Sequence, residues 1–266
     1  CPGRRRSIPT TRYFENAKGE QMIHYHGGPL GKSAQSHEFF AGRHSLISFA
    51  HRSELETMAE VSHSFVLDNG AFSVWKSGKS LDVQAYTDWV DDWRRHPGFD
   101  WALIPDVING SEDQNDGLIE DWPYTRDGVP VWHLNESLDR LDRLSLRWDR
   151  VAFGSTEGME PGSKQFWTRI AQAMDVLCDD LGRPRCKLHG LRMLDPKIFQ
   201  SIPLASADSA SAATRSFMPG QRFGMYLPKK ESQRANIIAD RVEAYNSAPL
   251  WNNRMTVQTE LKLCGQ

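Results

Sequence analysis

Cysteines are few in this chain and long apolar runs are missing, and both absences exclude classes of protein. Only 4 of the 266 residues are cysteine, and Cys1, Cys178, Cys186 and Cys264 form no C-x-x-C pair. This spacing indicates neither a disulfide framework nor a structural zinc site. No apolar run approaches the roughly 20 residues that a membrane-spanning helix needs. The expected location is therefore a reducing cytoplasm, without membrane contact.

The chain also lacks an excess of charge of one sign. It has 32 Lys and Arg against 34 Asp and Glu, a net charge of -2, which argues against a protein that coats nucleic acid indiscriminately. Local basic stretches remain at 4–6, 183–187 and 215–230. Neither G-x-G-x-x-G after a strand nor G-x-x-x-x-G-K-[ST] occurs, so the dinucleotide and P-loop classes have no support.

What the chain has is a regular succession of short apolar runs separated by stretches of helical periodicity. The predicted strands are Met22–Gly27, Ser45–Ala50, Ser64–Leu67, Trp101–Val107, Val129–Leu134, Arg150–Gly154, Cys186–Leu191 and Leu204–Ala207. Strands alternating with helices indicate parallel β-α-β units, and eight of them favour a closed TIM (β/α)8 barrel. The expected domains are a flexible arm at 1–21, the barrel at 22–247 and a tail at 248–266.

The helical stretches carry apolar residues every three or four positions. The pattern predicts helices along 83–93, 138–144 and 166–177, with Ser163 as the N-cap of the third, and another marked by Ile238, Val242 and Tyr245. Two polar segments, 109–126 and 216–231, are interpreted as insertions. Both follow a strand, so they are expected on the carboxyl-terminal face, where barrels keep their active sites.

Charged and polar side chains follow several of the predicted strands. Asp68, Asp106 and Asp208 end three of them, and His133 and His189 end two more. In a barrel these ends converge on one mouth. An aspartate at such a position is often only a helix N-cap or loop anchor, a histidine is often only a hydrogen-bonding group, and a glycine there can serve only a tight turn.

Several functions need carboxylates at one mouth. A nucleophile and a general acid/base flanking a glycosidic bond perform glycosyl transfer. A divalent ion held by Asp and His would give a hydrolase, although the expected early H-x-H is only loosely matched by His24-Tyr25-His26. A third alternative is a barrel that only binds a ligand, such as a nucleobase-binding subunit.

Two short motifs carry a resemblance to a known family. Asp68-Asn69-Gly70-Ala71-Phe72-Ser73 resembles the D-S-G-G-F-Q segment of tRNA-guanine transglycosylases (queuine tRNA-ribosyltransferases). Ala207-Asp208-Ser209 with Thr214-Arg215 resembles their D-x-x-x-P-T-R segment. The residues of these two motifs are more similar to those of the DNA-modifying branch, the 7-deazaguanine DNA transglycosylases of the DpdA type in phages and bacteria. The C-x-C-x-x-C zinc subdomain of the tRNA enzymes has no counterpart here, which favours DNA over tRNA.

The resemblance implies exchange of guanine in DNA for a 7-deazaguanine base such as preQ0, with tRNA-type exchange on RNA as an alternative. Asp208 would be the nucleophile at C1′ and Asp68 the general acid/base. The implied substrate-binding residues are Asp106, His133, Gly154, Ser155, His189, Gly190 and Phe72. The implied DNA-binding residues are Arg215, Arg222, Lys229 and Lys230. No cofactor or metal is expected. The expected partners are DNA and the free base, and a second copy of the chain or a modification complex is left open.

Overall fold

The structure is a computed structural model that describes residues 21–28, 30, 33–78, 80–217 and 228–252. Within this part of the chain no helix is long and apolar enough to cross a membrane. The predicted arm at 1–21, apart from Gln21, and most of the predicted tail lie outside the described residues.

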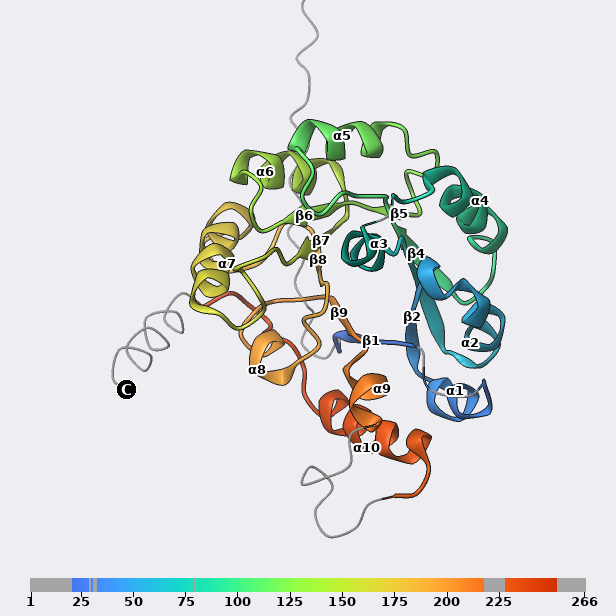
Figure 1. Ribbon diagram of the computed structural model, residues 1–266. Helices are drawn as coiled ribbons and strands as arrows, with labels where there is room; N and C mark the ends of the chain where they lie inside the picture. Colours follow the sequence, from blue (N-terminus) through green and yellow to red (C-terminus); the bar gives the residue numbers. More distant parts are fainter. Residues whose placement is uncertain (1–20, 29, 31–32, 79, 218–227, 253–266) are drawn as a thin grey trace, which may run out of the picture.

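Nine strands form one sheet in which all neighbouring pairs are parallel. They are β1 (Ile23–Gly27), β2 (His44–Ser48), β3 (Ser64–Asp68), β4 (Phe99–Leu103), β5 (Gly128–Val129), β6 (Val131–His133), β7 (Arg150–Gly154), β8 (Lys187–Gly190) and β9 (Ser206–Ser209). The order β5-β4-β3-β2-β1-β9-β8-β7-β6 follows the chain around a ring, with β1 beside β9. Figure 1 shows most of the helices outside this ring and α3 over its centre.

The ring closes at two short consecutive strands, β5 and β6. Pro130 separates β5 from β6, and proline has no backbone N–H to donate to a neighbouring strand. Before it, the Ile104 amide donates to the Val129 carbonyl (2.9 Å) on the β4 side. At Pro130 itself, the carbonyl accepts from the Ala152 amide (2.9 Å) on the β7 side. β5 and β6 together therefore act as the fifth of eight barrel strands, and the predicted (β/α)8 barrel is confirmed.

Helices and one 3-10 segment connect the strands. They are α1 (Ser33–Phe40), η1 (Phe49–Glu54), α2 (Leu55–Val61), α3 (Ala71–Ser77), α4 (Val83–Trp93), α5 (Glu112–Glu120), α6 (Leu138–Arg147), α7 (Lys164–Leu177), α8 (Pro196–Phe199), α9 (Ser211–Ser216) and α10 (Glu231–Glu243). The helices predicted from periodicity are α4, α6, α7 and α10, although α10 ends before Tyr245. Ser163 caps α7 as predicted, because its hydroxyl accepts from the Phe166 amide (3.1 Å).

The interpretation of 109–126 as an insertion is wrong. This segment contains α5, the crossover helix between β4 and β5. Ser111 caps it by accepting from the Gln114 amide (3.2 Å). The S-x-x-Q spacing is a helix-start signal that the segment's overall polarity obscures. The other predicted insertion, 216–231, lies largely outside the described residues.

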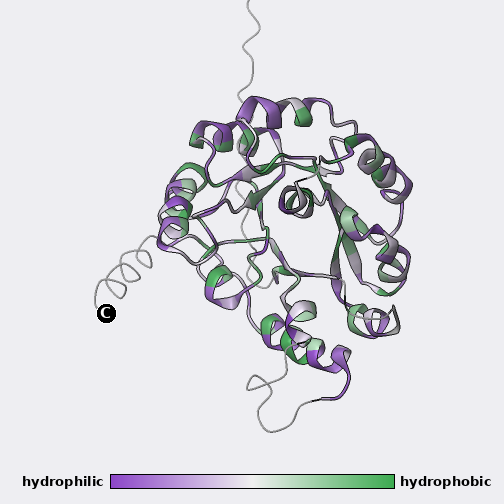
Figure 2. Cartoon of the chain, in the orientation of Figure 1, coloured by the Kyte–Doolittle hydropathy of each residue, from purple (hydrophilic) through white to green (hydrophobic). Residues whose placement is uncertain are grey.

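Apolar residues form two layers. The larger cluster lies between the sheet and the helices, and it includes Phe65, Trp132 and Phe153. Figure 2 shows hydrophobic residues on the helix sides that face the strands and hydrophilic residues on the outside. A smaller cluster that includes Tyr25 and Trp101 forms separately and consists mainly of alternate strand residues pointing to the barrel interior. The barrel is therefore a packed core, and the space for chemistry is at its carboxyl-terminal mouth.

Candidate active site

Asp68 is the last residue of β3 and the most perturbed carboxyl group at the mouth. Its pKa is raised from 3.8 to about 7, mainly by desolvation and also by the nearby carboxylates of Asp208 and Asp106. The hydroxyl of Ser48 and the amide of Gly70 (3.2 Å) donate to the Asp68 carboxylate and act in the opposite direction. Desolvation outweighs these hydrogen bonds, so Asp68 is about half protonated near pH 7.

Asp106 lies just beyond β4 and contacts the buried side chain of His133. One carboxylate oxygen accepts from Asn69 Nδ2 (2.7 Å), and the other is 2.8 Å from His133 Nε2 at the end of β6. The second ring nitrogen of His133 is buried without a partner in the described structure. It lies beside Gly154, where an added Cβ would be 2.8 Å from Nδ1. Gly154 therefore makes room for the Asp106–His133 pair.

Asp208 on β9 pairs with the second histidine. Its Oδ1 is 3.3 Å from His189 Nε2 and accepts from the Arg192 amide (3.0 Å). His189 is fully buried, and desolvation lowers its pKa. Its Nδ1 is 2.9 Å from the Ser206 hydroxyl. A neutral His189 donating through Nε2 to Asp208 and accepting at Nδ1 satisfies both contacts.

The α3 helix crosses the mouth rather than joining the outer ring (Figure 1). It starts after Gly70, whose φ of 77° is a conformation that favours glycine. The guanidinium of Arg192 lies 4.1 Å from the centre of the Phe72 ring, so α3 reaches the loop after β8. Arg192 itself has a φ of 60°, which is uncommon for a residue other than glycine and concentrates at functional sites.

The structure thus brings eight of the predicted site residues to the mouth: Asp68, Asp106, Asp208, His133, His189, Gly154, Gly190 and Phe72. Ser155 follows β7 and is partly buried. Gly190 permits close packing, because an added Cβ would lie 2.8 Å from the Met193 Cβ. Nothing tests the roles predicted for these residues.

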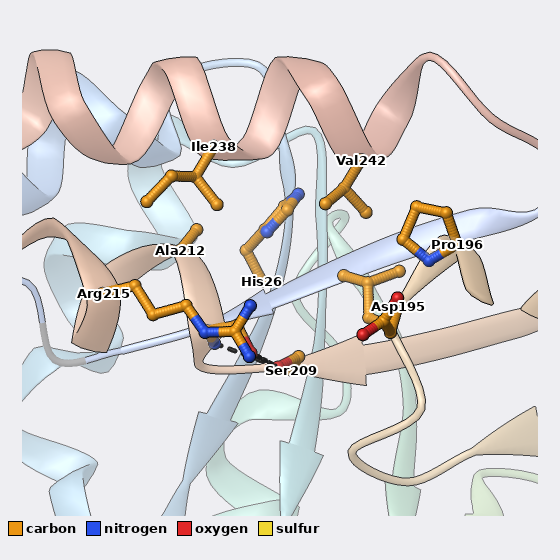
Figure 3. A pocket seen from close by; sticks show the side chains of 10 residues that line it. His26, Asp195, Pro196, Ser209, Ala212, Arg215, Ile238 and Val242 are labelled. Carbon is orange, nitrogen blue, oxygen red and sulfur yellow. Dashed lines mark hydrogen bonds between the residues drawn. The ribbon is translucent and has the colours of Figure 1, made fainter. Parts of the chain in front are cut away.

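Of the predicted DNA-binding residues, the described ones, Arg215, Lys229 and Lys230, are not part of this cluster. Arg215 lines a separate cavity of about 80 Å³ with His26, Ser209 and Asp195. Figure 3 shows the Arg215 side chain extending toward Ser209, while His26 points toward α10. Lys229 and Lys230 are exposed just before α10, with Lys230 Nζ 3.6 Å from Glu38. Arg222 lies outside the described residues.

Sequence reasoning missed the buried charges that support His133. Glu136 accepts from the His133 amide (2.8 Å), from Asn115 Nδ2 (2.9 Å) and from Arg140 (2.6 Å). Arg140 is fully buried. The spacing of four residues between Glu136 and Arg140 is a signal of an ion pair, although Glu136 itself precedes α6 and its N-cap Ser137. Ser48 was also missed, although it ends β2 as the aspartates end their strands.

Metal ligation finds no support in the described residues, which contain no group of three or more His, Cys, Asp or Glu placed to hold an ion. The two Asp–His contacts are separate pairs. The loosely matched His24-Tyr25-His26 does not contribute a ligand set: His24 contacts the Tyr245 carbonyl, His26 pairs with Glu243, and the Tyr25 hydroxyl donates to Asp100.

Comparison with known proteins shows the fold and not a family. No protein-family model matches the chain, and no curated protein matches it. Among solved structures, a mutant tryptophan synthase α-subunit from Pyrococcus furiosus has 11% identity and a TM-score of 0.54, covering 88% of this chain and 100% of its own. A second mutant of that subunit has 12% identity and a TM-score of 0.53, covering 87% and 98%. An aldolase-type barrel from Coccidioides immitis has 13% identity and a TM-score of 0.49, covering 85% and 91%.

The resemblance to tRNA-guanine transglycosylases and their DNA-modifying branch is therefore wrong. Neither group has a family model that matches the chain, and the solved structures that share its fold include tryptophan synthase α-subunits. The D-N-G-A-F-S and S-A-D-S motifs misled because short strand-end motifs recur in unrelated barrels, where an aspartate, a glycine turn and a small residue meet the same geometric demands. Guanine exchange in DNA, and with it the glycosyltransferase class, loses its support. The expected DNA and base partners and the cytoplasmic location remain untested predictions.

Proposed function

We propose that this protein is an enzyme that performs acid–base chemistry on a small molecule at the barrel mouth, with Asp68 as the proton-transferring group. The observation that carries the proposal is the meeting of Asp68, Asp106 and Asp208 at one mouth, where burial and the other two carboxylates raise the pKa of Asp68 to about 7. A catalytic acid or base works best when its pKa lies near the operating pH, and strongly perturbed carboxyl groups cluster at functional sites.

The surroundings of Asp68 support a division of roles. Asp208 and Asp106 are each held by hydrogen bonds from a histidine and from a second N–H donor, the Arg192 amide and Asn69. These two carboxylates are fixed acceptors that can orient polar groups of a substrate. At Asp68, desolvation favours the protonated form of the carboxyl group. Pairs of carboxyl groups in contrasting environments are how enzymes separate acid and base roles.

The reaction class follows from the protonation of Asp68. A group that is half protonated near pH 7 can donate a proton in one step and accept one in another, as lyase and isomerase reactions require. The location at the carboxyl-terminal face agrees with this, because barrel enzymes keep their active sites there. The structural neighbours named tryptophan synthase are also parts of an enzyme. The likeness itself shows only the fold.

Deuterium exchange tests the proposal. Pools of small polar metabolites are incubated with the protein in D2O at pH 7 and analysed by mass spectrometry. Wild type is expected to convert at least one compound with deuterium incorporation. Asp68→Asn is expected to be slower by about 10²- to 10⁴-fold, the usual contribution of general acid–base catalysis.

Glu60→Gln is the matched control, because Glu60 is an exposed carboxylate on α2. It is expected to match wild type. The proposal fails if Asp68→Asn retains the wild-type rate, if conversion occurs without deuterium uptake, or if folded wild-type protein converts nothing across broad pools.

A further inference from the structure

A large cavity opens beside the aspartate cluster. Its volume is about 710 Å³, within the range of roughly 300–1,000 Å³ typical of small-molecule sites. Its walls come from α3, the segment 80–83, the loop after β4 and α5. Asp106 is one of the lining residues, so the cavity is continuous with the candidate active site.

The walls expose apolar side chains to solvent. Trp75 is 44% exposed, Val107 is 37% exposed and Val83 is 36% exposed, and all three line the cavity. Exposed large apolar side chains gathered in a concave surface mark binding sites, because a ligand that covers them removes apolar area from water. Leu118 and Ile108 extend this surface. The cavity is therefore suited to a ligand with an apolar or aromatic body.

The charged groups among the described residues that line the cavity are all of one sign. Its lining includes Asp106, Asp113 and Asp121, and no Lys, Arg or His occurs among the described lining residues. Gln114, Gly117, Leu118 and Asp121 follow one another at helical spacing, so one face of α5 borders the cavity. The carboxylates of Asp113 and Asp121 make no hydrogen bond or ion pair within the described structure. A cation would find both electrostatic partners and the ring face of Trp75.

We propose that this cavity binds an organic cation, a small molecule with an apolar or aromatic body and a protonated amine. The body lies on Trp75 and Val107, and the amine faces the carboxylates of α5. That this ligand is the substrate, with its reacting end at the aspartate cluster, rests on the proposed function. Binding in the cavity does not.

Three probes of the same shape and different charge test the selectivity. They are 2-phenylethylamine, 2-phenylethanol and phenylacetate, titrated into the full chain at pH 7 and low salt by calorimetry. The amine is expected to bind about two- to fivefold more tightly than the alcohol, the effect of exposed charge pairs, and the acid most weakly. The preference should shrink in 0.5 M NaCl because salt screens exposed charges. No amine binding, or equal binding of all three probes, overturns the proposal.

Two variant pairs locate the site. An added Cβ at Gly117 meets nothing within 4 Å, so Gly117→Leu places a side chain in the cavity without backbone strain and should reduce amine binding at least about tenfold. Gly117→Ala is its smaller control. Asp121→Asn should reduce the amine's preference over the alcohol, whereas Glu120→Gln, an exposed neighbour outside the lining, should not. Unchanged amine binding by folded Gly117→Leu contradicts the proposal.

Asp68→Asn separates this inference from the proposed function. Asp68 does not line the cavity, so this variant should bind 2-phenylethylamine within about twofold of wild type. Amine binding without Asp68-dependent turnover would leave the cation site standing and remove the catalytic proposal. If turnover depends on Asp68 but the protein does not prefer the amine, the catalytic proposal stands and the cation site is removed.

Discussion

Replacing Asp68 by asparagine should change how the stability of the protein depends on pH. The folded state raises the pKa of this carboxyl group from 3.8 to about 7. Between these values the folded protein holds a proton that the unfolded chain has lost. The relative stabilisation from Asp68 is therefore complete below pH 3.8 and is lost as the pH rises through about 7.

The magnitude follows from the same two pKa values. A difference of one in pKa corresponds to 1.36 kcal/mol, so the change from 3.8 to about 7 gives at most about 4 kcal/mol. Asp68 retains some exposure to solvent, which screens the penalty, and we expect about 2 kcal/mol. The asparagine side chain of the variant never ionises, so the variant escapes this loss.

Urea unfolding between pH 4 and pH 8 measures the effect. Wild type and variant should have similar free energies of unfolding at pH 4. Between pH 4 and pH 7 the free energy of unfolding of the variant should rise relative to that of wild type, and above pH 7 the difference should stay constant. Taking the difference between the two proteins cancels the titration of other groups. A difference that does not change with pH would refute a raised pKa at Asp68 and remove the main support for its catalytic role.

Two further substitutions test the supports of the site. Arg140→Ala leaves buried Glu136 without its cation and should lower the free energy of unfolding by about 3–5 kcal/mol in urea titrations. Arg143 is an exposed arginine that shares Asp116 with Arg140, and Arg143→Ala should lower the free energy of unfolding by less than about 1 kcal/mol. Equal losses in the two variants would contradict the burial argument. Gly154→Ala should push its methyl group against His133 and cost about 1–3 kcal/mol, and an unchanged His133 ring resonance in NMR spectra would show that the two are not in contact.

Much of the barrel could be predicted from local patterns. Strand β7 has the bounds that its apolar run predicts, and α7 starts after its capping serine. These elements depend on residues within a few positions of one another, so the sequence contains the whole signal. The strand-end rule likewise predicted that Asp68, Asp106 and Asp208 share one mouth, because parallel strands in a closed ring present the same ends to one face.

Other features depend on contacts between distant segments. The Pro130 break is visible in the sequence, but its role in closing the ring depends on the pairing of β5 with β4 and of β6 with β7. The position of α3 is likewise a tertiary feature, because its Phe72 and Trp75 are partly exposed over the mouth and beside the large cavity.

The sequence by itself determined the order of the strands, four of the helices and the identity of the three converging carboxylates. The tertiary structure decided that the pKa of Asp68 is raised and which groups surround this carboxyl group. The pKa of Asp68 is the sum of desolvation, two carboxylates and two hydrogen bonds, and three of these four neighbouring groups, Ser48, Asp106 and Asp208, come from other parts of the chain. Such a sum depends on distance and dielectric in the folded molecule, which a short motif does not encode. The motif alone pointed to glycosyl transfer, and the folded site supports proton transfer.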